Sequence, residues 1–315
     1  MNISSNLSQT VTNRQSELVA LVSVYGCAAV TGAVLSTTLF LTIILRPQLR
    51  TGSGILLAHH QLLHMLQTGI VSPFYIVTGW GVFLGASIDG INCTAMFFVC
   101  QIVICSEIWS SLFLAVNRLI ALIFPHYYSR ISSTAAIAGF IITAWVISVA
   151  VNLPGVFGIG SYFAKREVDC GYTRVTNQHI FNAVGILGKY LPLALQAVVY
   201  GVILFHHFRA QNGLQAAAKK RFNLFRLLLC SYAWYMACYA PYLMTYYGFR
   251  RYWFADEVRM GWFMAVQEIG YAGSPVFLLL MNKDIVKIAK EGLRIRLRDY
   301  REPKLEEGEQ GDKGY

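Results

Sequence analysis

The sequence is short of charge. Aspartate, glutamate, lysine and arginine make up 13% of its 315 residues, and 56% of the residues are hydrophobic. Soluble domains carry about 25% charged residues, so this composition excludes an ordinary soluble domain. The chain has apolar runs of membrane length instead, because a helix needs about 20 apolar residues to cross a bilayer. The runs span residues 18–45, 54–78, 91–124, 135–157, 180–205, 222–247 and 258–281.

These runs predict an all-α membrane protein, a seven-transmembrane helix bundle followed by a short amphipathic helix on the cytoplasmic surface. We expect an extracellular tail at residues 1–17 without a cleavable signal peptide, the bundle at 18–281, the amphipathic helix at 282–298 and a disordered cytoplasmic tail at 299–315. Internal repeats, which many transporters contain, are absent from the sequence. We therefore expect a single membrane domain.

Acidic residues are also scarce, with 16 against 26 basic ones, which gives a net charge of +10. The basic excess falls on one side of the predicted membrane, where it includes Arg130, Arg209 and the Lys-Lys-Arg run at 219–221. Cytoplasmic loops carry such an excess, so the N-terminus is expected outside the cell. The basicity reports topology in a multi-pass plasma-membrane protein, and we expect no nucleic-acid partner.

Five of the seven cysteines lie in apolar runs, and only Cys93 and Cys170 fall in predicted outer loops or at the ends of runs. They form the one plausible disulfide. No cysteine follows Cys238, which excludes a palmitoyl anchor at the end of the amphipathic helix. Asn2 and Asn6 each begin a glycosylation sequon in the predicted outer tail.

Arg118 is a charge at the inner end of the run 91–124. A charged side chain costs roughly 2.5–3.5 kcal/mol at the centre of a membrane helix, so it usually has a function. Residues at helical spacing place Glu107 on the same face, three turns above the arginine. The full stripe is Cys100, Ile104, Glu107, Ser111, Leu114 and Arg118.

From Arg118 outward, the chain resembles the rhodopsin-like (class A) G-protein-coupled receptors along residues 18–298. The short loops and the Asn117-Arg118 pair are similar to invertebrate chemosensory receptors, and an orphan member is the alternative. The residues that carry the resemblance, in the order and spacing of the family, are Cys93, Asn117-Arg118-Leu119, Trp145, Pro154, Pro192, Tyr200, Cys238-Tyr239-Ala240-Pro241 and Ser274-Pro275.

The resemblance implies a receptor, not an enzyme, that binds an extracellular small molecule or short peptide within the bundle. Movement of the sixth helix would then activate a heterotrimeric G protein. The implied partners are that G protein, the ligand and the lipid bilayer, with neither a cofactor nor a metal. The residues implied for G-protein coupling are Asn117, Arg118 and Tyr200, and those for the activation switch are Ile108, Pro192, Tyr235, Tyr239, Pro241, Ser274 and Pro275.

Two departures from the family concern the charges around Arg118. The acid that precedes the arginine in the family is replaced by Asn117, and the acid that some members carry in the sixth helix is replaced by Arg221. Both usual carboxylate partners are missing. We therefore expect a weak restraint on the inactive state and measurable signalling without ligand.

A third departure lies in the second and third helices. Counting back from Pro73, His64 stands where the family keeps a sodium-binding aspartate, and Glu107 stands where it usually has a small polar residue. We infer that the two side chains form an internal pair in place of the sodium ion. The pair is either a static polar bridge or a protonation-linked switch.

The ligand cavity is expected between the third, fifth, sixth and seventh helices. Cys100 replaces the aspartate of amine receptors, which disfavours a biogenic amine, and Glu268 replaces the retinal-linking lysine of opsins, which excludes light sensing. Lys189 and Glu268 would suit a zwitterion or a short peptide, unless they snorkel or bond locally. The predicted lining is Cys100, Gln101, Ile104, Lys189, Tyr239, Tyr242, Tyr246, Met264, Gln267 and Glu268.

Two other classes of membrane protein, a transporter and a metal hydrolase, are alternatives to the receptor. A proton- or ion-coupled transporter could use His64 and Glu107 as a relay, but the missing repeats argue against it. A membrane metal hydrolase could use His59, His60 and His64, of which the last two share a helical face. That reading needs a carboxylate and a further ligand from other spans, and no other span has a paired histidine motif.

Overall fold

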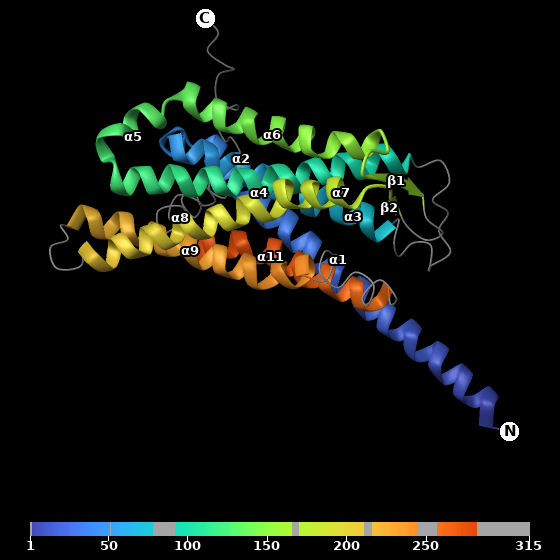
Figure 1. Cartoon of the computed structure of the whole chain (residues 1–315). Coiled ribbons are helices and arrows are strands. Elements are labelled where there is room, and N and C mark those ends of the chain that lie inside the picture. Colours follow the sequence, from blue (N-terminus) through green and yellow to red (C-terminus); the bar gives the residue numbers. More distant parts are fainter. Residues whose placement is uncertain are drawn as a thin grey trace, which may run out of the picture.

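The computed structural model of the chain describes residues 2–50, 52–77, 92–165, 170–210, 216–244 and 257–281. Long helices run side by side along one axis, and the N-terminal end of the first projects beyond the others (Figure 1). The elements in chain order are α1 (Asn2–Leu45), η1 (Pro47–Leu49), α2 (Gly52–Leu66), η2 (Gln67–Val71), α3 (Ser72–Tyr75), α4 (Cys93–Ile123), α5 (Pro125–Ile131), α6 (Thr134–Val156), β1 (Ser161–Lys165), β2 (Cys170–Val175), α7 (Gln178–Gly185), η5 (Ile186–Tyr190), α8 (Leu191–Ala210), α9 (Ala216–Leu243) and α11 (Glu257–Met281).

Seven helical segments correspond to the seven predicted spans, which confirms the all-α bundle. Two of them are composite, because α2, η2 and α3 follow one another without a break and so do α7, η5 and α8. Four helices within the described residues are long and apolar enough to cross a membrane: Ser16–Leu45, Cys93–Ile123, Thr134–Val156 and Gln178–His206. The predicted amphipathic helix at 282–298 and the tail at 299–315 lie outside the described residues.

Helix α4 occupies the centre of the bundle. It packs against α2, α6, α8 and α9, and 67% of its most apolar stretch is buried, compared with 17% for α6. The outer face of α6 exposes large apolar side chains such as Ile142 and Val146, as expected for a helix that faces lipid. Polar side chains carried by α4 are therefore enclosed on several sides by other helices.

The polar segment before residue 18 differs from the expected tail, because α1 is helical from Asn2 onward. Residues 2–17 contain neither proline nor glycine, so nothing in that stretch interrupts a helix that continues into the apolar run. The side chains of the two sequon asparagines, Asn2 and Asn6, lie outside the described part of the structure, and their glycosylation stays a prediction.

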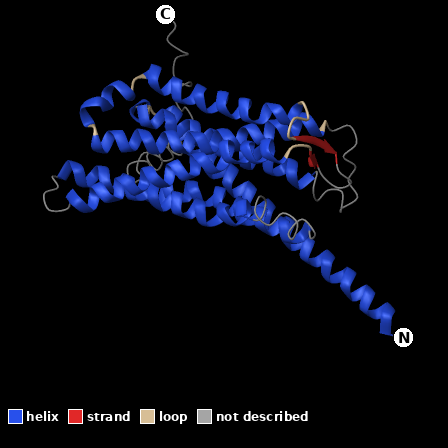
Figure 2. Ribbon diagram, viewed as in Figure 1, coloured by secondary structure: helices blue, strands red, loops and turns tan. Residues whose placement is uncertain are grey.

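A two-stranded hairpin was not expected from the sequence. β1 and β2 pair antiparallel between the ends of α4 and α6, and Figure 2 shows them in red at one end of the bundle. The chain enters β1 through Gly160, whose φ of 85° is the left-handed conformation that glycine adopts without strain. The backbone N–H groups of Thr176 and Asn177 both donate to the Gly160 carbonyl, which closes the base of the hairpin.

Two π turns interrupt the composite helices. η2 precedes Pro73 and η5 precedes Pro192, and in each case the proline follows within two residues of the end of the turn. Proline has no N–H to donate and its ring crowds the preceding turn, so a wider turn relieves the conflict. Polar residues of the composite helices, including Gln67 and Lys189, lie within these turns.

Close contact between α9 and α11 depends on Gly273. A Cβ atom added there would lie 2.8 Å from Cε2 of Trp234. We expect Gly273→Ala to lower the melting temperature of the purified protein, because overpacking of this kind costs about 1–3 kcal/mol. Gly139→Ala on α6 is the matched control, since nothing lies within 4 Å of its added Cβ. Alanine is favoured in a helix by up to about 1 kcal/mol, so the control should melt at or above the wild-type temperature. Equal melting temperatures for the two variants would contradict this packing.

Candidate functional site

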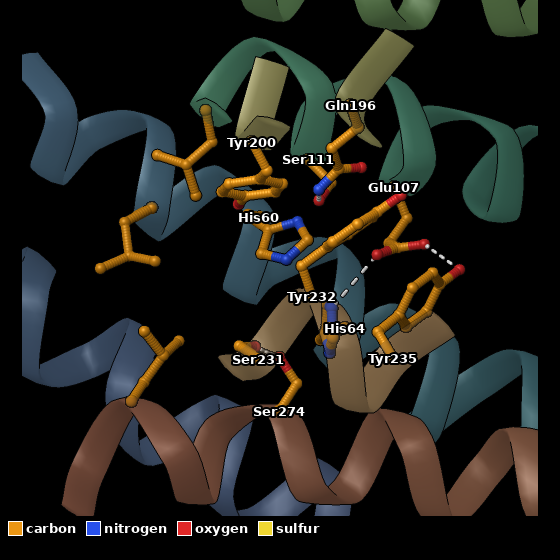
Figure 3. Close-up of a pocket in the computed structure, with 13 residues that line it drawn as sticks. His60, His64, Glu107, Ser111, Gln196, Tyr200, Ser231, Tyr232, Tyr235 and Ser274 are labelled. Atoms are coloured by element: carbon orange, nitrogen blue, oxygen red, sulfur yellow. Dashed lines mark hydrogen bonds and ion pairs between the residues drawn. The ribbon is translucent and has the colours of Figure 1, made fainter. Parts of the chain in front are cut away.

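The centre of the bundle contains a buried pair of side chains that were predicted to meet. Nε2 of His64 on α2 lies 3.3 Å from Oε1 of Glu107 on α4, and each residue is 1% exposed. Figure 3 shows the pair with the hydroxyl groups that surround it. The contact joins the second and third helices inside a region where no bulk water can solvate either group.

The other oxygen of Glu107 accepts a hydrogen bond from the sixth span. The hydroxyl of Tyr235 on α9 donates to Oε2 at 3.2 Å (Figure 3). The Tyr235 ring stacks on Tyr239 at 5.1 Å between centroids and lies 5.8 Å from the ring of Tyr271. Glu107 therefore links α2, α4 and α9 through one carboxylate.

A cavity of about 30 Å³ lies beside this pair, which is room for one or two water molecules. Hydrogen bonds cross it, from Gln196 Nε2 to Ser111 Oγ at 2.8 Å and between the hydroxyls of Ser231 and Ser274 at 3.0 Å. We call it the inner cavity; its lining is Leu57, His60, His64, Glu107, Ser111, Leu114, Gln196, Tyr200, Ser231, Tyr232, Tyr235, Ser274 and Leu278.

His59 has a different role from its two neighbours on α2. The indole N–H of Trp145 on α6 donates to its Nε2 at 3.0 Å, so Nε2 is an acceptor. The neutral ring then carries its proton on Nδ1, which donates to Ser110 Oγ at 2.9 Å. Both nitrogens are satisfied, and His59 fastens α2 to α4 and α6.

Arg118 lies near the C-terminal end of α4 beside Tyr128 and Tyr200. Among the residues that the structure describes, no carboxylate forms an ion pair with it. The adjacent Asn117 is 0% exposed, and its amide nitrogen and oxygen have no hydrogen-bond partner in the described residues. The side chain of Arg221 lies outside the described part.

Three of the predicted switch residues, Ile108, Tyr235 and Tyr239, lie in one apolar cluster. The cluster also contains Leu193, which directly follows Pro192. Pro241 lies inside α9 and Pro275 inside α11, where each removes a helical hydrogen bond. The serine that precedes Pro275 makes the hydroxyl contact across the inner cavity.

A second cavity, of about 20 Å³, lies farther from Arg118, and we call it the outer cavity. It brings together seven of the ten residues predicted to bind a ligand. Their positions come from α4, η5, α9 and α11, as expected. These seven are Ile104, Lys189, Tyr239, Tyr242, Met264, Gln267 and Glu268.

The remaining three predicted residues do not line it. Cys100 packs in an apolar cluster with Val71 and Phe74, because its position on α4 faces α3. Gln101, one residue further along α4, is buried but absent from the lining. Tyr246 lies outside the described residues.

Three lining residues were missed by the sequence reasoning. Tyr25 comes from α1, Gln67 from η2 and Tyr75 from α3, so the first two spans also contribute to the outer cavity. An uncharged polar residue inside an apolar run, such as Gln67, was the available signal. The π turn that contains Gln67 has no counterpart in the sequence pattern.

The outer cavity contains two side chains of opposite charge. Lys189 is 7% exposed and Glu268 is 1% exposed. Oε1 of Glu268 has no hydrogen-bond partner among the described residues. A buried carboxylate oxygen without a partner is costly, and a ligand that donates to it would remove that cost.

The end of α4 nearest the hairpin is fixed covalently. Cys93 begins this helix after the cap Asn92, whose side chain accepts from the Ala95 N–H at 3.1 Å. Cys93 is disulfide-bonded, and Cys27, Cys100, Cys105, Cys230 and Cys238 are free. The remaining cysteine of the chain is Cys170 in β2, which we propose as its partner.

Comparison with known proteins identifies the architecture. Residues 36–251, more than half of the chain, match the pattern of the 7 transmembrane receptor (rhodopsin family). The chain belongs to the rhodopsin family of receptors. The predicted class is thereby confirmed, and the receptor's helices can be numbered one to seven in the family order.

Several curated receptors are similar to this one. Probable G-protein coupled receptor 173 of Mus musculus is 28% identical over 152 residues, which cover 46% of this chain and 39% of the relative. Its Homo sapiens form is 31% identical over 101 residues, covering 30% and 26%. The Alpha-1A adrenergic receptor of Oryzias latipes is 25% identical over 210 residues, covering 64% and 42%. The matched part thus spans about two fifths of the first relatives' own length.

A double-mutant cycle on His64 and Glu107 tests their interaction. We expect His64→Leu and Glu107→Leu each to lower the free energy of unfolding by about 3–5 kcal/mol, because each leaves one buried polar partner behind. The double variant should lose less than the sum, with a coupling energy of about 1–3 kcal/mol. His206→Leu, at an exposed histidine of α8, should change stability by less than about 0.5 kcal/mol. Additive losses in thermal or denaturant unfolding would show that the pair does not interact.

Proposed function

We propose that this receptor binds an extracellular small molecule or short peptide at the outer cavity, which has to widen from about 20 Å³ to admit it, and activates a heterotrimeric G protein at the end that contains Arg118. The observation that carries the proposal is a series of contacts and shared cavity walls between these two regions. It begins at Tyr239, which lines the outer cavity and stacks on Tyr235. Tyr235 donates to Glu107, and both line the inner cavity.

The inner cavity carries the contacts on to the arginine. Tyr200 lines this cavity, lies 4.8 Å from the Tyr232 ring between centroids, and neighbours Arg118. A ligand that displaces Tyr239 would therefore disturb one connected set of side chains on α4, α8 and α9. Pro241 gives α9 a point at which it can bend, which suits a rigid-body movement of that helix.

The basic excess supports a plasma-membrane receptor with its N-terminus outside, since Arg130 and Arg209 lie at the Arg118 end of the bundle. This orientation places the outer cavity toward the extracellular side. The proposed Cys93–Cys170 disulfide would then lie in an oxidising compartment, where such bonds persist. Membership of the receptor family disfavours the transporter alternative.

The ligand proposed for the outer cavity carries both an anionic and a cationic or hydrogen-bond-donating group. Lys189 would receive the anion and Glu268 the donor, in a cavity whose other walls are mainly aromatic. One of the similar receptors is named an adrenergic receptor. The aspartate of amine receptors is replaced here by Cys100, which packs away from the cavity, so we propose a zwitterion or a short peptide instead of an amine.

Signalling without ligand tests the coupling residues. In cells that express a promiscuous G protein, wild-type receptor should signal above untransfected cells, because Arg118 has no carboxylate partner among the described residues. Asn117→Asp should lower this activity about fivefold, since a new charge pair worth about 1 kcal/mol shifts the equilibrium by that factor. Arg118→Ala should abolish it, whereas Arg130→Ala, at an exposed position of α5, should not.

Surface expression must be matched in these measurements. Asn117→Ala is the control for Asn117→Asp, because it removes the amide without adding a negative charge. This variant should keep the wild-type activity. Wild-type signalling equal to that of untransfected cells would contradict the weak restraint. An unaltered ligand response in Arg118→Ala would contradict the coupling role.

A second test concerns the outer cavity. A library of zwitterionic metabolites and short peptides is screened on the wild type, and active compounds are then tested on Lys189→Gln and Glu268→Gln. Loss of a charged hydrogen bond costs about 1.5–3 kcal/mol, so each variant should raise the half-maximal concentration roughly 10- to 100-fold. Glu17→Gln makes the same change at an exposed residue of α1 outside the lining and should have no effect. Active compounds with equal potency on all four proteins would rule out this ligand site.

A further inference from the structure

Three side chains at the edge of the inner cavity are arranged like ligands of a metal ion. His60 and His64 come from α2 and Glu107 from α4, and one nitrogen or oxygen from each lies within 4.8 Å of the others. All three are buried (Figure 3). Two histidines four residues apart present their rings from one helical face, which is a spacing that zinc sites use. Their ring centroids are 4.5 Å apart.

The distances fit a coordination sphere of small radius. Zinc bonds to histidine nitrogen and carboxylate oxygen are about 2.0–2.2 Å long, so two such ligands in a tetrahedral site lie about 3.3–3.5 Å apart. His64 Nε2 and Glu107 Oε1 are 3.3 Å apart. The helix pair already holds one edge of such a tetrahedron, and a ring nitrogen of His60 lies within 4.8 Å of both atoms of that edge.

The three histidines of α2 differ in their hydrogen bonding, and His60 and His64 differ from His59 in this respect. His60 Nδ1 and His64 Nδ1 are buried without a hydrogen-bond partner in the described residues, and His64 Nε2 has only the 3.3 Å contact with Glu107 in place of one. Both nitrogens of His59 are bonded. Each buried polar atom without a partner costs about 1–3 kcal/mol, and coordination to a metal offsets that cost.

Groups around the three side chains orient Glu107 and leave room for a fourth ligand. The Tyr235 hydroxyl holds Glu107 Oε2 and leaves Oε1 toward His64, as outer-shell groups orient metal-binding carboxylates. The inner cavity has room for a water molecule as a fourth ligand, and its lining includes the hydroxyl of Ser111.

We propose that His60, His64 and Glu107 bind a divalent transition-metal ion, with Zn²⁺ as the fitting member of that class. Two imidazoles and one carboxylate favour such an ion, whereas sodium, magnesium and calcium prefer sites made of oxygen atoms. The ion would tie α2 to α4 at mid-bundle. This proposal is independent of the ligand and of the G-protein contact proposed above.

The metal reading also bears on the hydrolase alternative. That alternative lacked a carboxylate from another span, and Glu107 supplies it. The ligands are enclosed by the five spans that line the inner cavity, and membership of the receptor family disfavours hydrolysis. The proposed site is therefore one of binding and helix linkage, without a catalytic step.

Metal binding is measured on the purified full chain in lipid nanodiscs after treatment with a chelator. Co²⁺ is titrated first, because a site of four or five ligands gives strong visible absorption, and Zn²⁺ is then used to displace it. We expect one tightly bound ion per wild-type chain and a melting temperature that rises with Zn²⁺ concentration. Glu107→Gln and His64→Asn should each weaken Co²⁺ binding at least 10-fold. His206→Ala, at an exposed histidine on α8, controls for surface binding and should match the wild type.

Tyr235→Phe keeps all three ligands and removes only the hydroxyl that orients Glu107. Loss of such a group weakens metal binding about 10- to 100-fold, and this variant remains informative if the ligand variants fail to fold. X-ray absorption of the zinc-loaded wild type should show two imidazoles in the first shell. Absence of the cobalt bands from the wild type, or bands that persist unchanged in Glu107→Gln and His64→Asn, would overturn the proposal. So would a melting temperature that rises with Na⁺ and not with Zn²⁺.

Discussion

The structure depends on how buried polar groups are satisfied where lipid replaces water. A membrane bundle offers such groups only one another, and an unpaired one is costly. Glu107 meets this constraint by contacting His64 through one oxygen and Tyr235 through the other. Because the three come from different spans, the requirement to pair one carboxylate also sets the relative positions of α2, α4 and α9. Buried polar groups of α8 and α11 are paired in the same way, by the hydrogen bond of Gln196 with Ser111 and that of Ser231 with Ser274.

Helix α4 connects the regions to which function is assigned. One of its ends is held by the Cys93 disulfide near the hairpin, its middle carries Glu107, and its other end carries Arg118. Helix α4 lines both cavities, as α9 and α11 also do. In the proposed function, a change at the outer cavity reaches Arg118 through side chains that pack on α4, without requiring that α4 itself move. This arrangement suits a receptor in which α4 keeps its position and α9 moves.

Much of this arrangement was predictable from the sequence, because membrane spans are dictated by hydropathy and helical periodicity. The seven spans follow from hydropathy, whereas the contact of His64 with Glu107 and seven of the outer-cavity residues followed from the resemblance to the receptor family. The hairpin was missed because β1 and β2 are short and lie in a segment that reads as a loop. The helical start of α1 was not predicted, because residues 1–17 are polar and show no apolar helical periodicity. Tyr25 and Tyr75 could not be placed, since the tilt of α1 and the π turn before α3 leave no mark in the pattern.

The two π turns determine which polar groups the outer cavity contains. Each turn holds one residue more than a regular helix would, and each contains a lining residue, Gln67 in η2 and Lys189 in η5. One residue corresponds to about 100° of rotation around a helix axis. If either turn were regular, every residue on its outer side would face a different neighbour while the inner half of the same helix stayed in place. The extra residues therefore set the phase between the two halves of each span, so the surface that faces the outer cavity and the surface nearer Arg118 can be specified separately within one span.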